Sequence, residues 1–348
     1  MPWGFDGKEV VVVSDKSVAY LGCIDPYHIE GDMDEIAASG CTSIVLTVNE
    51  SDWNYYRKAR KAIIEAARAR GLKVYLNMHG FGIFASSWPS SSYLLERPEA
   101  CQLFNTGRRT TLACPNHEGF SAWLKDRIKE VVEEFGPDGM FWDEPRFQDS
   151  EGWPQEWACR CESCRRAFET KYGKPLPEEV SPEVLEFRQE SLLRFLKEVI
   201  KVGKEVGGGE SVLCLMPWDR TGREPKLSPG WYGVVDWEPF VGIPELDVFS
   251  TDPYWIHCQP FEYFESNVKE AVQLAGRYGK KCQIWVQAVW IPPGKEVEVR
   301  RSLLAAAEMG ADMLAVWSFR GEPGSHVLDL GGDVELVWEM VKEAYRSL

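Results

Sequence analysis

The sequence has no stretch approaching the about 20 consecutive apolar residues that a membrane-spanning helix needs. Basic residues are also few, because 39 Lys and Arg face 54 Asp and Glu, which gives a formal charge of −15. Nucleic acids and anionic membrane surfaces are bound by clusters of positive charge, so the composition argues against both as partners. Residues 1–6 lack the basic start and apolar core of a signal peptide, and we therefore expect a cytoplasmic protein.

Apolar and aromatic residues, in contrast, are plentiful. Hydrophobic residues make up 44% of the 348-residue chain and charged residues 27%, which is typical of an ordered globular protein with a large core. The chain also has 15 Trp, several of which lie beside polar residues in expected loops, including Trp218, Trp255 and Trp290. Indole faces in such places suit stacking on sugar rings or other flat ligands, whereas the remaining Trp suit a large core.

The expected elements alternate regularly between strands and helices. Short apolar runs rich in β-branched residues predict eight strands, at residues 17–24, 41–48, 72–78, 138–143, 211–216, 246–251, 281–288 and 312–318. Amphipathic patterns predict helices at residues 32–39, 53–70, 119–135, 183–206, 261–278, 296–309 and 334–347. Strands that alternate with helices form a parallel sheet, and eight such units close most naturally into an α/β fold of the (β/α)8 TIM barrel type.

We expect residues 1–348 to form a single domain with long loops after strands three, four and five. Two of these loops are excursions at residues 79–118 and 145–182, whereas the helix-to-strand connections are short. Barrel enzymes carry their active sites at the C-terminal ends of the strands, so the long loops mark one functional face. Candidate substrate-binding residues follow the strand ends and are Asp25, His79, Trp142, Trp218, Asp219, Tyr254, Trp255, Gln287, Trp290, Trp317 and Arg320.

The fourth expected strand ends in two adjacent carboxylates. Residues 140–142 are apolar, Asp143 and Glu144 follow, and Pro145 stops the strand because it cannot donate a hydrogen bond to the sheet. Successive side chains of an extended chain point to opposite sides, so at least one of the two carboxylates must face the centre of the sheet. In the alternative, structural interpretation, one carboxylate caps the next element and the other pairs with Arg146.

The 10 cysteines fall into two groups. Most of the scattered ones lie in or beside expected strands, as small buried apolar residues do. Cys159, Cys161 and Cys164 instead form a C-x-C-x-x-C pattern, which brings three thiolates together. Tetrahedral zinc needs a fourth ligand, for which Cys114 in the other excursion is the best candidate and His117 the alternative. The pattern predicts a structural zinc that joins the two excursions; reduced cysteines without a metal, or a disulfide, are the alternatives.

Two stretches resemble known barrel enzymes. The run at residues 108–116 (RRTTLACPN), followed by Cys159, Cys161, Cys164, Phe168 and the Lys-Tyr-Gly at 171–173, resembles the zinc-binding pattern of the family 42 β-galactosidases. Residues 138–143 (DGMFWD) are similar to the strand-four motif of the barrel families known as hypothetical glycosyl hydrolases. The resemblance covers about residues 100–175 and the general barrel plan. It implies a glycosidase, a hydrolase of O-glycosyl bonds, with a carbohydrate substrate and a zinc ion.

The sequence departs from the β-galactosidase pattern at the catalytic positions. Those enzymes carry Asn-Glu at the end of strand four and a Glu at the end of strand seven, whereas Asp143-Glu144 and Gln287 stand here. The nearest second acid is Asp252 at the end of strand six. A strand-four nucleophile with a strand-six acid/base is the arrangement of the α-galactosidase and α-glucosidase barrels. That resemblance implies Asp143 as nucleophile and Asp252 as acid/base, while the competing assignment keeps Glu144 as acid/base.

Several candidate residues also have structural interpretations. Asp252 begins the run Asp-Pro-Tyr-Trp, which is good turn chemistry after a strand. Arg320 also suits an ion pair with Glu322, and His79 also suits a hydrogen-bonded position on the barrel rim.

Two other functions are compatible with the sequence. The missing strand-seven Glu is compatible with a barrel that binds carbohydrate without hydrolysing it. A metal-dependent barrel enzyme would use His79, Glu144 and Asp252 together with His28 or His257, although a chain with 5 His supplies few such ligands.

Overall fold

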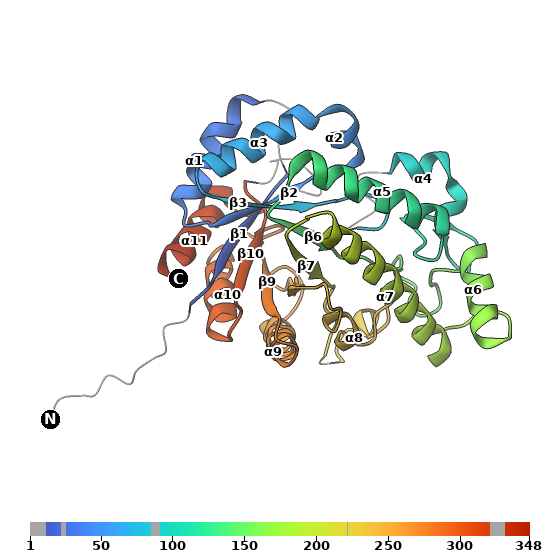
Figure 1. Ribbon diagram of the computed structural model, residues 1–348. Helices are drawn as coiled ribbons and strands as arrows, with labels where there is room; N and C mark the ends of the chain where they lie inside the picture. The colour runs from blue at the N-terminus through green and yellow to red at the C-terminus, as the bar shows by residue number, and fades with distance from the viewer. Residues whose placement is uncertain (1–11, 22–25, 85–90, 221, 321–330) are drawn as a thin grey trace.

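The computed structural model describes residues 12–21, 26–84, 91–220, 222–320 and 331–348 (Figure 1). Eight parallel strands close into a barrel in the order β1-β10-β9-β8-β7-β6-β3-β2. Their bounds are β1 Asp15–Tyr20, β2 Ser43–Thr47, β3 Lys73–Asn77, β6 Gly139–Asp143, β7 Glu210–Cys214, β8 Val248–Thr251, β9 Lys281–Gln287 and β10 Met313–Trp317. The predicted (β/α)8 TIM barrel is therefore confirmed.

The interior of the barrel is packed. Alternate residues of each strand point inward, and Val45, Phe141 and Trp285 belong to the inner apolar cluster. Tyr75 occupies the space beside Gly139, where an added Cβ would stand 2.4 Å from the Tyr75 ring. Gly139 is thus needed for the close approach of this ring. The packed interior forms a base beneath the C-terminal ends of the strands.

Helices cover the outside of the barrel (Figure 1). They are α1 Ile29–Ala38, α3 Arg57–Ala69, α5 Glu118–Phe135, α7 Pro182–Glu205, α9 Phe261–Arg277, α10 Val297–Glu308 and α11 Val334–Ser347, with the short turn η1 Pro26–His28 before α1. The helix predicted at 53–70 is instead divided into α2 (Glu50–Tyr55) and α3, because Tyr56 leaves helical geometry with φ −122° and ψ 24°. Asn49 and Asp52 form a capping box that starts α2 earlier than predicted.

The excursions contain structure of their own. Residues 79–118 include α4 (Ser92–Glu96), the 3-10 turn η2 (Pro98–Ala100) and an antiparallel hairpin of β4 (Cys101–Leu103) and β5 (Arg109–Ala113). Residues 145–182 include α6 (Glu162–Tyr172), and the loop after β7 includes η3 (Pro225–Leu227) and α8 (Glu238–Val241). Figure 1 shows α4 and α6 on the side of the barrel away from α1 and α11. The excursions therefore extend the barrel in one direction.

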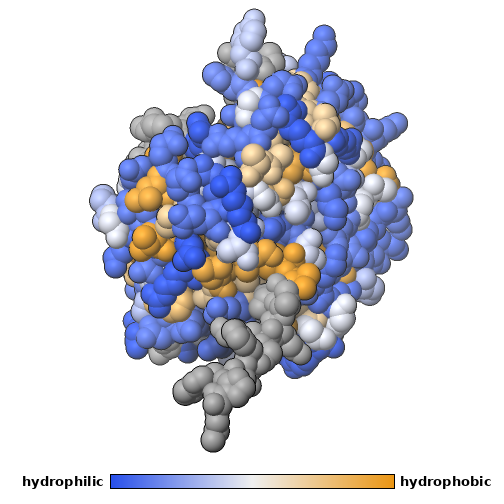
Figure 2. All heavy atoms as spheres, turned by 90° about the vertical axis from the view of Figure 1, so that its left-hand side faces the viewer, coloured by the Kyte–Doolittle hydropathy of each residue, from blue (hydrophilic) through white to orange (hydrophobic). Residues whose placement is uncertain are grey.

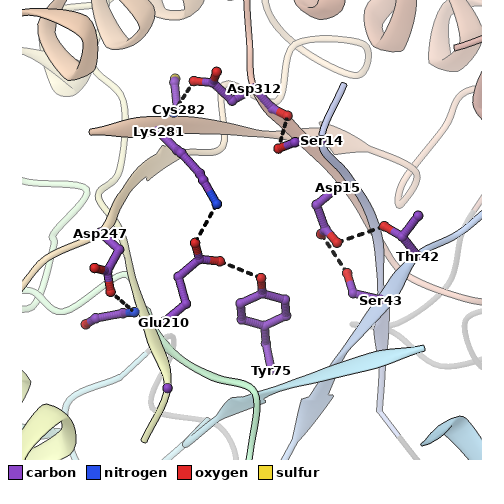
Figure 3. A network of polar contacts seen from close by, with 12 residues as sticks. Ser14, Asp15, Thr42, Ser43, Tyr75, Glu210, Asp247, Lys281, Cys282 and Asp312 are labelled. Carbon is purple, nitrogen blue, oxygen red and sulfur yellow. Dashed lines mark hydrogen bonds and ion pairs between the residues drawn. The ribbon is translucent and has the colours of Figure 1, made fainter. Parts of the chain in front are cut away.

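A polar network closes the N-terminal end of the barrel (Figure 3). Glu210, at the start of β7, accepts hydrogen bonds from the Tyr75 hydroxyl at 2.6 Å and the Lys281 ammonium at 2.7 Å. Asp15, at the start of β1, accepts one from the Ser43 hydroxyl at 2.7 Å. Each of these carboxylates thus has hydrogen-bond donors that hold it in place.

The outer surface is largely polar. Figure 2 shows the side of the molecule that lies on the left of Figure 1, where hydrophilic side chains predominate and apolar ones gather in a smaller zone. Val297 on α10 and Leu336 on α11 are among the large apolar side chains that remain exposed. Within the described ranges, no helix combines the length and the apolar character that crossing a membrane requires.

Candidate active site and cysteine cluster

A cavity of about 420 Å³ lies at the C-terminal end of the barrel. Its wall is formed by the ends of several strands and by the loops that follow them, which is where barrel enzymes carry their active sites. Three carboxyl groups, Asp143, Glu144 and Asp252, line it together. The aromatic part of the wall includes Trp231, Tyr254, Tyr263, Trp285, Trp290 and Trp317. Such a mixture of aromatic faces and a few polar groups is typical of small-molecule sites.

Asp143 is the last residue of β6 and is buried in the cavity wall. Asn77, the last residue of β3, donates a hydrogen bond from Nδ2 to Asp143 Oδ2 at 2.8 Å. Burial and the negative charge of Glu144 raise the pKa of Asp143 to about 7, against the opposing effects of Asn77 and Arg146. Asp143 therefore changes its charge near neutral pH.

Glu144 leaves the strand with a positive φ of 39°. Residues other than glycine rarely adopt this backbone conformation, and such strain is found most often at functional sites. The Glu144 carboxylate accepts a hydrogen bond from Arg146 Nη1 through Oε2, and it accepts another from Asp252. Burial opposes the ionisation of Glu144, but the charge of Arg146 and these hydrogen bonds outweigh it and hold the pKa of Glu144 below its usual value.

Asp252 follows β8, and its Oδ1 lies 3.9 Å from the Sγ of Cys214 on the neighbouring strand. Burial raises the pKa of Asp252 well above its usual value, and the charge of Glu144 and the hydrogen bond to it raise this pKa further. The result is a protonated Asp252 beside an ionised Glu144. Carboxyl groups whose pKa values are pushed apart in this way can serve as acid and base, and coupled groups of this kind titrate together.

Four further predicted residues line the same cavity: His79, Tyr254, Trp290 and Trp317. Burial lowers the pKa of His79 to about 4, although the charge of Glu144 acts in the opposite direction. His79 is therefore neutral at pH 7, and its ring centroid lies 6.0 Å from that of Trp317. Trp290 keeps 44% of its surface exposed, so its indole remains accessible to a ligand that enters the cavity.

Three predicted indoles lie outside the cavity wall. Trp142 and Trp255 are buried and donate their Nε1 hydrogens to the hydroxyls of Ser211 at 2.8 Å and Ser302 at 2.9 Å. Trp218 packs against Trp237, with ring centroids 4.7 Å apart. These three side chains therefore belong to the packing between the barrel and its outer layer.

Asp219, Gln287 and Arg320 also lie outside the wall. Asp219 Oδ2 accepts a hydrogen bond from the backbone N–H of Glu224 at 2.6 Å, and Arg320 forms an ion pair with Glu35 at 2.8 Å. Gln287 donates from Nε2 to the Val289 carbonyl at 2.8 Å, so it supports a loop that lines the cavity. Asp25 lies outside the described residues.

The sequence pattern did not single out several lining residues, notably Arg146, Cys214 and Tyr263. Arg146 was expected only as the structural partner of a carboxylate, and its ion pair with Glu144 is present within the cavity itself. Tyr263 lies on α9, where its apolar neighbours indicate only a core-facing position. The sequence pattern around Cys214 indicates only a small buried residue in a strand.

Cys114, Cys159, Cys161 and Cys164 form a buried cluster between the two excursions. Their Sγ atoms all lie within 4.8 Å of one another, with 3.4 Å between Cys114 and Cys164, and all four are free thiols. Tetrahedral zinc with Zn–S bonds of about 2.3 Å separates its sulfurs by about 3.8 Å. The cluster could therefore hold a metal such as zinc.

The surroundings of the cluster also suit a metal. N–H groups donate to its sulfurs: Leu103 N to Cys159 at 3.4 Å, Asn116 N to Cys114 at 3.4 Å, and Asn116 Nδ2 to Cys164 at 3.3 Å. Such donors stabilise the thiolate form, which is the form that binds metals. The donor set and its environment thus fit one closed four-sulfur site.

His117, the alternative fourth ligand, has a different role. Its Nδ1 accepts a hydrogen bond from the backbone N–H of Phe120 at 3.1 Å, which makes His117 the N-cap of α5. Cys114 is the residue that completes the cluster.

Comparison with known proteins supports the fold. Neither a protein-family model nor a curated protein sequence matches this chain. The endo-1,4-β-mannanase from Rhizomucor miehei is 11% identical, with 99% of this chain and 97% of that chain covered at a TM-score of 0.63. The glycoside hydrolase domain of PgaB (BpsB) from Bordetella bronchiseptica is 13% identical, with coverage of 94% and 98% at a TM-score of 0.60. At these identities the likeness shows the (β/α)8 barrel fold alone.

Proposed function

We propose that this protein is a glycoside hydrolase in which Asp143 is the nucleophile and Asp252 the acid/base. The observation that carries the proposal is the convergence of three carboxyl groups with separated pKa values in one aromatic-lined cavity. Glycosidases of most families need two carboxyl groups at the scissile bond, one protonated and one ionised. The barrel likeness to a mannanase and to another glycoside hydrolase domain supports the same reaction class.

In the proposed reaction, protonated Asp252 donates its proton to the glycosidic oxygen as the bond to the sugar breaks. Ionised Asp143 attacks the anomeric carbon and forms a glycosyl ester. Asp252, now ionised, takes a proton from water, whose oxygen attacks the anomeric carbon and displaces the carboxylate of Asp143. Two displacements at one carbon predict retention of the anomeric configuration.

Glu144 and Arg146 supply the electrostatic setting for this pair. The ionised Glu144 raises the pKa of Asp252 and thereby keeps the acid protonated. Arg146 balances the charge of Glu144, so the buried group of three carboxyls does not carry an uncompensated pair of negative charges. Glu144 therefore acts on the protonation of its neighbours rather than on the substrate carbon.

The charge of the wall also indicates the kind of sugar. Among the described lining residues, Arg146 is the one Lys or Arg, and it is already paired with Glu144. His79 is neutral at pH 7 because burial lowers its pKa to about 4. An anionic sugar would thus meet carboxylates without a cation to receive it, so we propose an uncharged sugar stacked on the aromatic wall.

For the cysteine cluster we propose structural zinc. Four thiolates would complete a tetrahedral site with no open position for water, so the metal would stabilise the joined excursions without taking part in the reaction. Cys114, Cys159, Cys161 and Cys164 would be its ligands.

A panel of nitrophenyl glycosides of both anomeric series tests the activity, and NMR of the first product tests retention. We expect turnover of at least one uncharged glycoside, unaffected by a chelator that leaves the cysteine cluster loaded. Asp252→Asn should lose most activity on substrates with poor leaving groups while still binding them in calorimetry. Binding without turnover across the panel would instead identify a carbohydrate-binding barrel, and loss of activity on chelation at full zinc content would indicate a second, catalytic metal.

A further inference from the structure

Gln102 is a fully buried polar side chain in the short hairpin of the first excursion. Its Nε2 donates hydrogen bonds to the carbonyls of Ala113 at 2.9 Å and Arg146 at 3.0 Å. Its Oε1 accepts a hydrogen bond from the backbone N–H of Gln148 at 2.7 Å. The amide thus joins the partner strand of the hairpin to the backbone on both sides of residue 147.

The segment that Gln102 holds has little other backbone support. Residues 144–150 form no regular structure, and Pro145 has no N–H to donate. The backbone N–H of Glu144 donates to the Cys214 carbonyl at 3.1 Å, and that of Phe147 donates to the Tyr232 carbonyl at 2.9 Å. The contacts with Gln102 lie next to these anchors, and they include the carbonyl of Arg146 itself.

The hairpin is in turn anchored to the cysteine cluster. Leu103, the next residue after Gln102, donates its N–H to Cys159 Sγ at 3.4 Å and accepts a hydrogen bond from Arg160 N at 2.7 Å. Cys114 N donates to the Ala100 carbonyl at 2.8 Å. Gln102 therefore connects a firmly held hairpin to the residue that pairs with Glu144.

We propose that Gln102 is a positioning residue that holds Arg146 against Glu144 and thereby sets the pH at which Asp143 ionises. The kinetic part of this proposal rests on the proposed hydrolase function, whereas the ionisation of Asp143 does not. Asn77 donates a hydrogen bond to Asp143, and the titratable groups that line the same cavity are His79, Glu144, Arg146, Cys214, Asp252, Tyr254, His257 and Tyr263. Among the described residues that line the cavity, only Arg146 carries a fixed positive charge.

The direction of the effect follows from that charge. Arg146 lowers the pKa of each of the three carboxyl groups, so a displaced Arg146 lets all three bind protons more readily. In Gln102→Met the pKa of Asp143 should rise by about one unit, since loss of a nearby opposite charge shifts a carboxyl pKa by 1–3 units and Arg146 is displaced rather than removed. At pH 6 this corresponds to about a tenfold fall in the ionised fraction.

Asn105 offers a matched control in the same hairpin. Its Nδ2 donates to the Gln155 carbonyl at 2.8 Å, and its Oδ1 accepts from Trp157 N at 3.2 Å. Asn105→Leu thus removes an amide bridge between the same two excursions without touching the segment that carries Arg146. Gln102→Glu is the second variant, because it keeps the acceptor for Gln148 N and the size of the side chain.

The test is a pH titration of Asp143 by NMR of protein labelled with ¹³Cγ-aspartate, with the signal assigned through Asp143→Asn and zinc content measured for every variant. We expect Gln102→Met and Gln102→Glu, which both remove the donor to the Arg146 carbonyl, to raise the pKa of Asp143 by about one unit, and Asn105→Leu to leave it unchanged. The acid limb of kcat/KM should move by the same amount. Equal shifts in Gln102→Met and Asn105→Leu, or no shift in either Gln102 variant, would overturn the positioning role. Absence of turnover in the wild type would refute the hydrolase, and the NMR titration would still decide the role of Gln102.

Discussion

Both ends of the barrel carry carboxyl groups, but the surroundings of these groups differ between the two ends. At the N-terminal end, Glu210 is held by the Tyr75 hydroxyl and the Lys281 ammonium, and Asp15 accepts from Ser43 (Figure 3). Each acid there lies apart from the next and has donors of its own. The hydrogen-bonding capacity of each acid is thus met by neighbouring donors.

At the C-terminal end, three carboxyls share one cation. Asp143, Glu144 and Asp252 line one cavity, and Glu144 is the one of the three that pairs with Arg146, which also lies 3.7 Å from Asp149. The pKa of Asp143 rises to about 7 and that of Asp252 rises well above its usual value, while that of Glu144 falls. The same strands thus end in a satisfied network on one side and a crowded one on the other, which is the division between stability and chemistry typical of this fold.

The difference between the two ends is tested most strongly by replacing one acid at each end with its amide. Asp143→Asn should lower kcat/KM on the order of 10⁴-fold, because the proposed nucleophile is lost. It should also stabilise the fold above pH 7. The folded-state pKa of Asp143, about 7, lies above the ordinary 3.8, so its ionisation opposes folding increasingly as pH rises through this window. The amide removes that penalty, which is on the order of 4 kcal/mol at most.

Glu210→Gln is the counterpart at the N-terminal end. It should destabilise the fold by about 1–3 kcal/mol, because the Lys281 and Tyr75 donors lose a charged acceptor. Its kcat/KM per folded molecule should equal that of the wild type. Urea unfolding at pH 6 and 8, together with kinetics, measures both variants. Loss of activity in Glu210→Gln, or lower stability of Asp143→Asn at pH 8, would contradict the division between the two ends.

The second prediction concerns what supports the crowded end. Cys164→Ser should release the proposed zinc and lower the unfolding midpoint, because a structural metal contributes its binding free energy to the fold. Hydrogen exchange should lose protection in β4, β5 and α6 while the N-terminal ends of the strands keep theirs. Cys282→Ser, at the N-terminal end of β9, is the control: it replaces a buried cysteine outside the cluster and should leave the zinc content unchanged. Equal protection losses in both variants would show that the cluster has no special role.

Much of the fold was predictable from the sequence because it rests on local pattern. Apolar runs of strand length alternate with amphipathic helices, and the strand ends at Asn77 and Asp143 lie close to where the pattern placed them. The cysteine spacing also carries its own geometry, since a C-x-C-x-x-C turn brings its thiols together wherever it folds. The hairpin of β4 and β5 was not predicted, because its strands are short and its pairing is set by contacts with the second excursion.

The site was less predictable because its chemistry depends on contacts between distant segments. The end of a strand does not reveal which way a side chain turns, so Trp142 and Trp255 entered the list of candidates although they hydrogen-bond to Ser211 and Ser302. The sequence around Gln102 does not indicate its role, because its amide donates a hydrogen bond to the carbonyl of Arg146, 44 positions later. The distribution of charge within the cavity is likewise not evident from the sequence, because the charged residues come from loops that are distant in the chain.

The third prediction tests how the crowding sets the pH range. Glu144→Gln removes the charge that raises the pKa values of Asp143 and Asp252, so both should fall. The acid and alkaline limbs of the pH profile should therefore both move to lower pH, by about one unit. This is the opposite direction from Gln102→Met. Kinetics from pH 4 to 9 on an activated glycoside measure it, and an unmoved or raised acid limb would remove Glu144 from the coupled group.

We expect the smallest effect when the N-terminal network loses one hydrogen-bond donor, Lys281, and keeps the carboxylate of Glu210. Lys281→Met leaves Glu210 with the Tyr75 hydroxyl, and the Lys281 side chain is already 49% exposed. Exposed ion pairs contribute about 0–1 kcal/mol, so we expect a loss of stability below about 1 kcal/mol that shrinks in high salt. Urea unfolding at low and high salt measures it, with the pH profile as the second readout. A shift of either limb would mean that charge at this end reaches Asp143 through the packed interior, and the two ends would then have to be treated as one electrostatic unit.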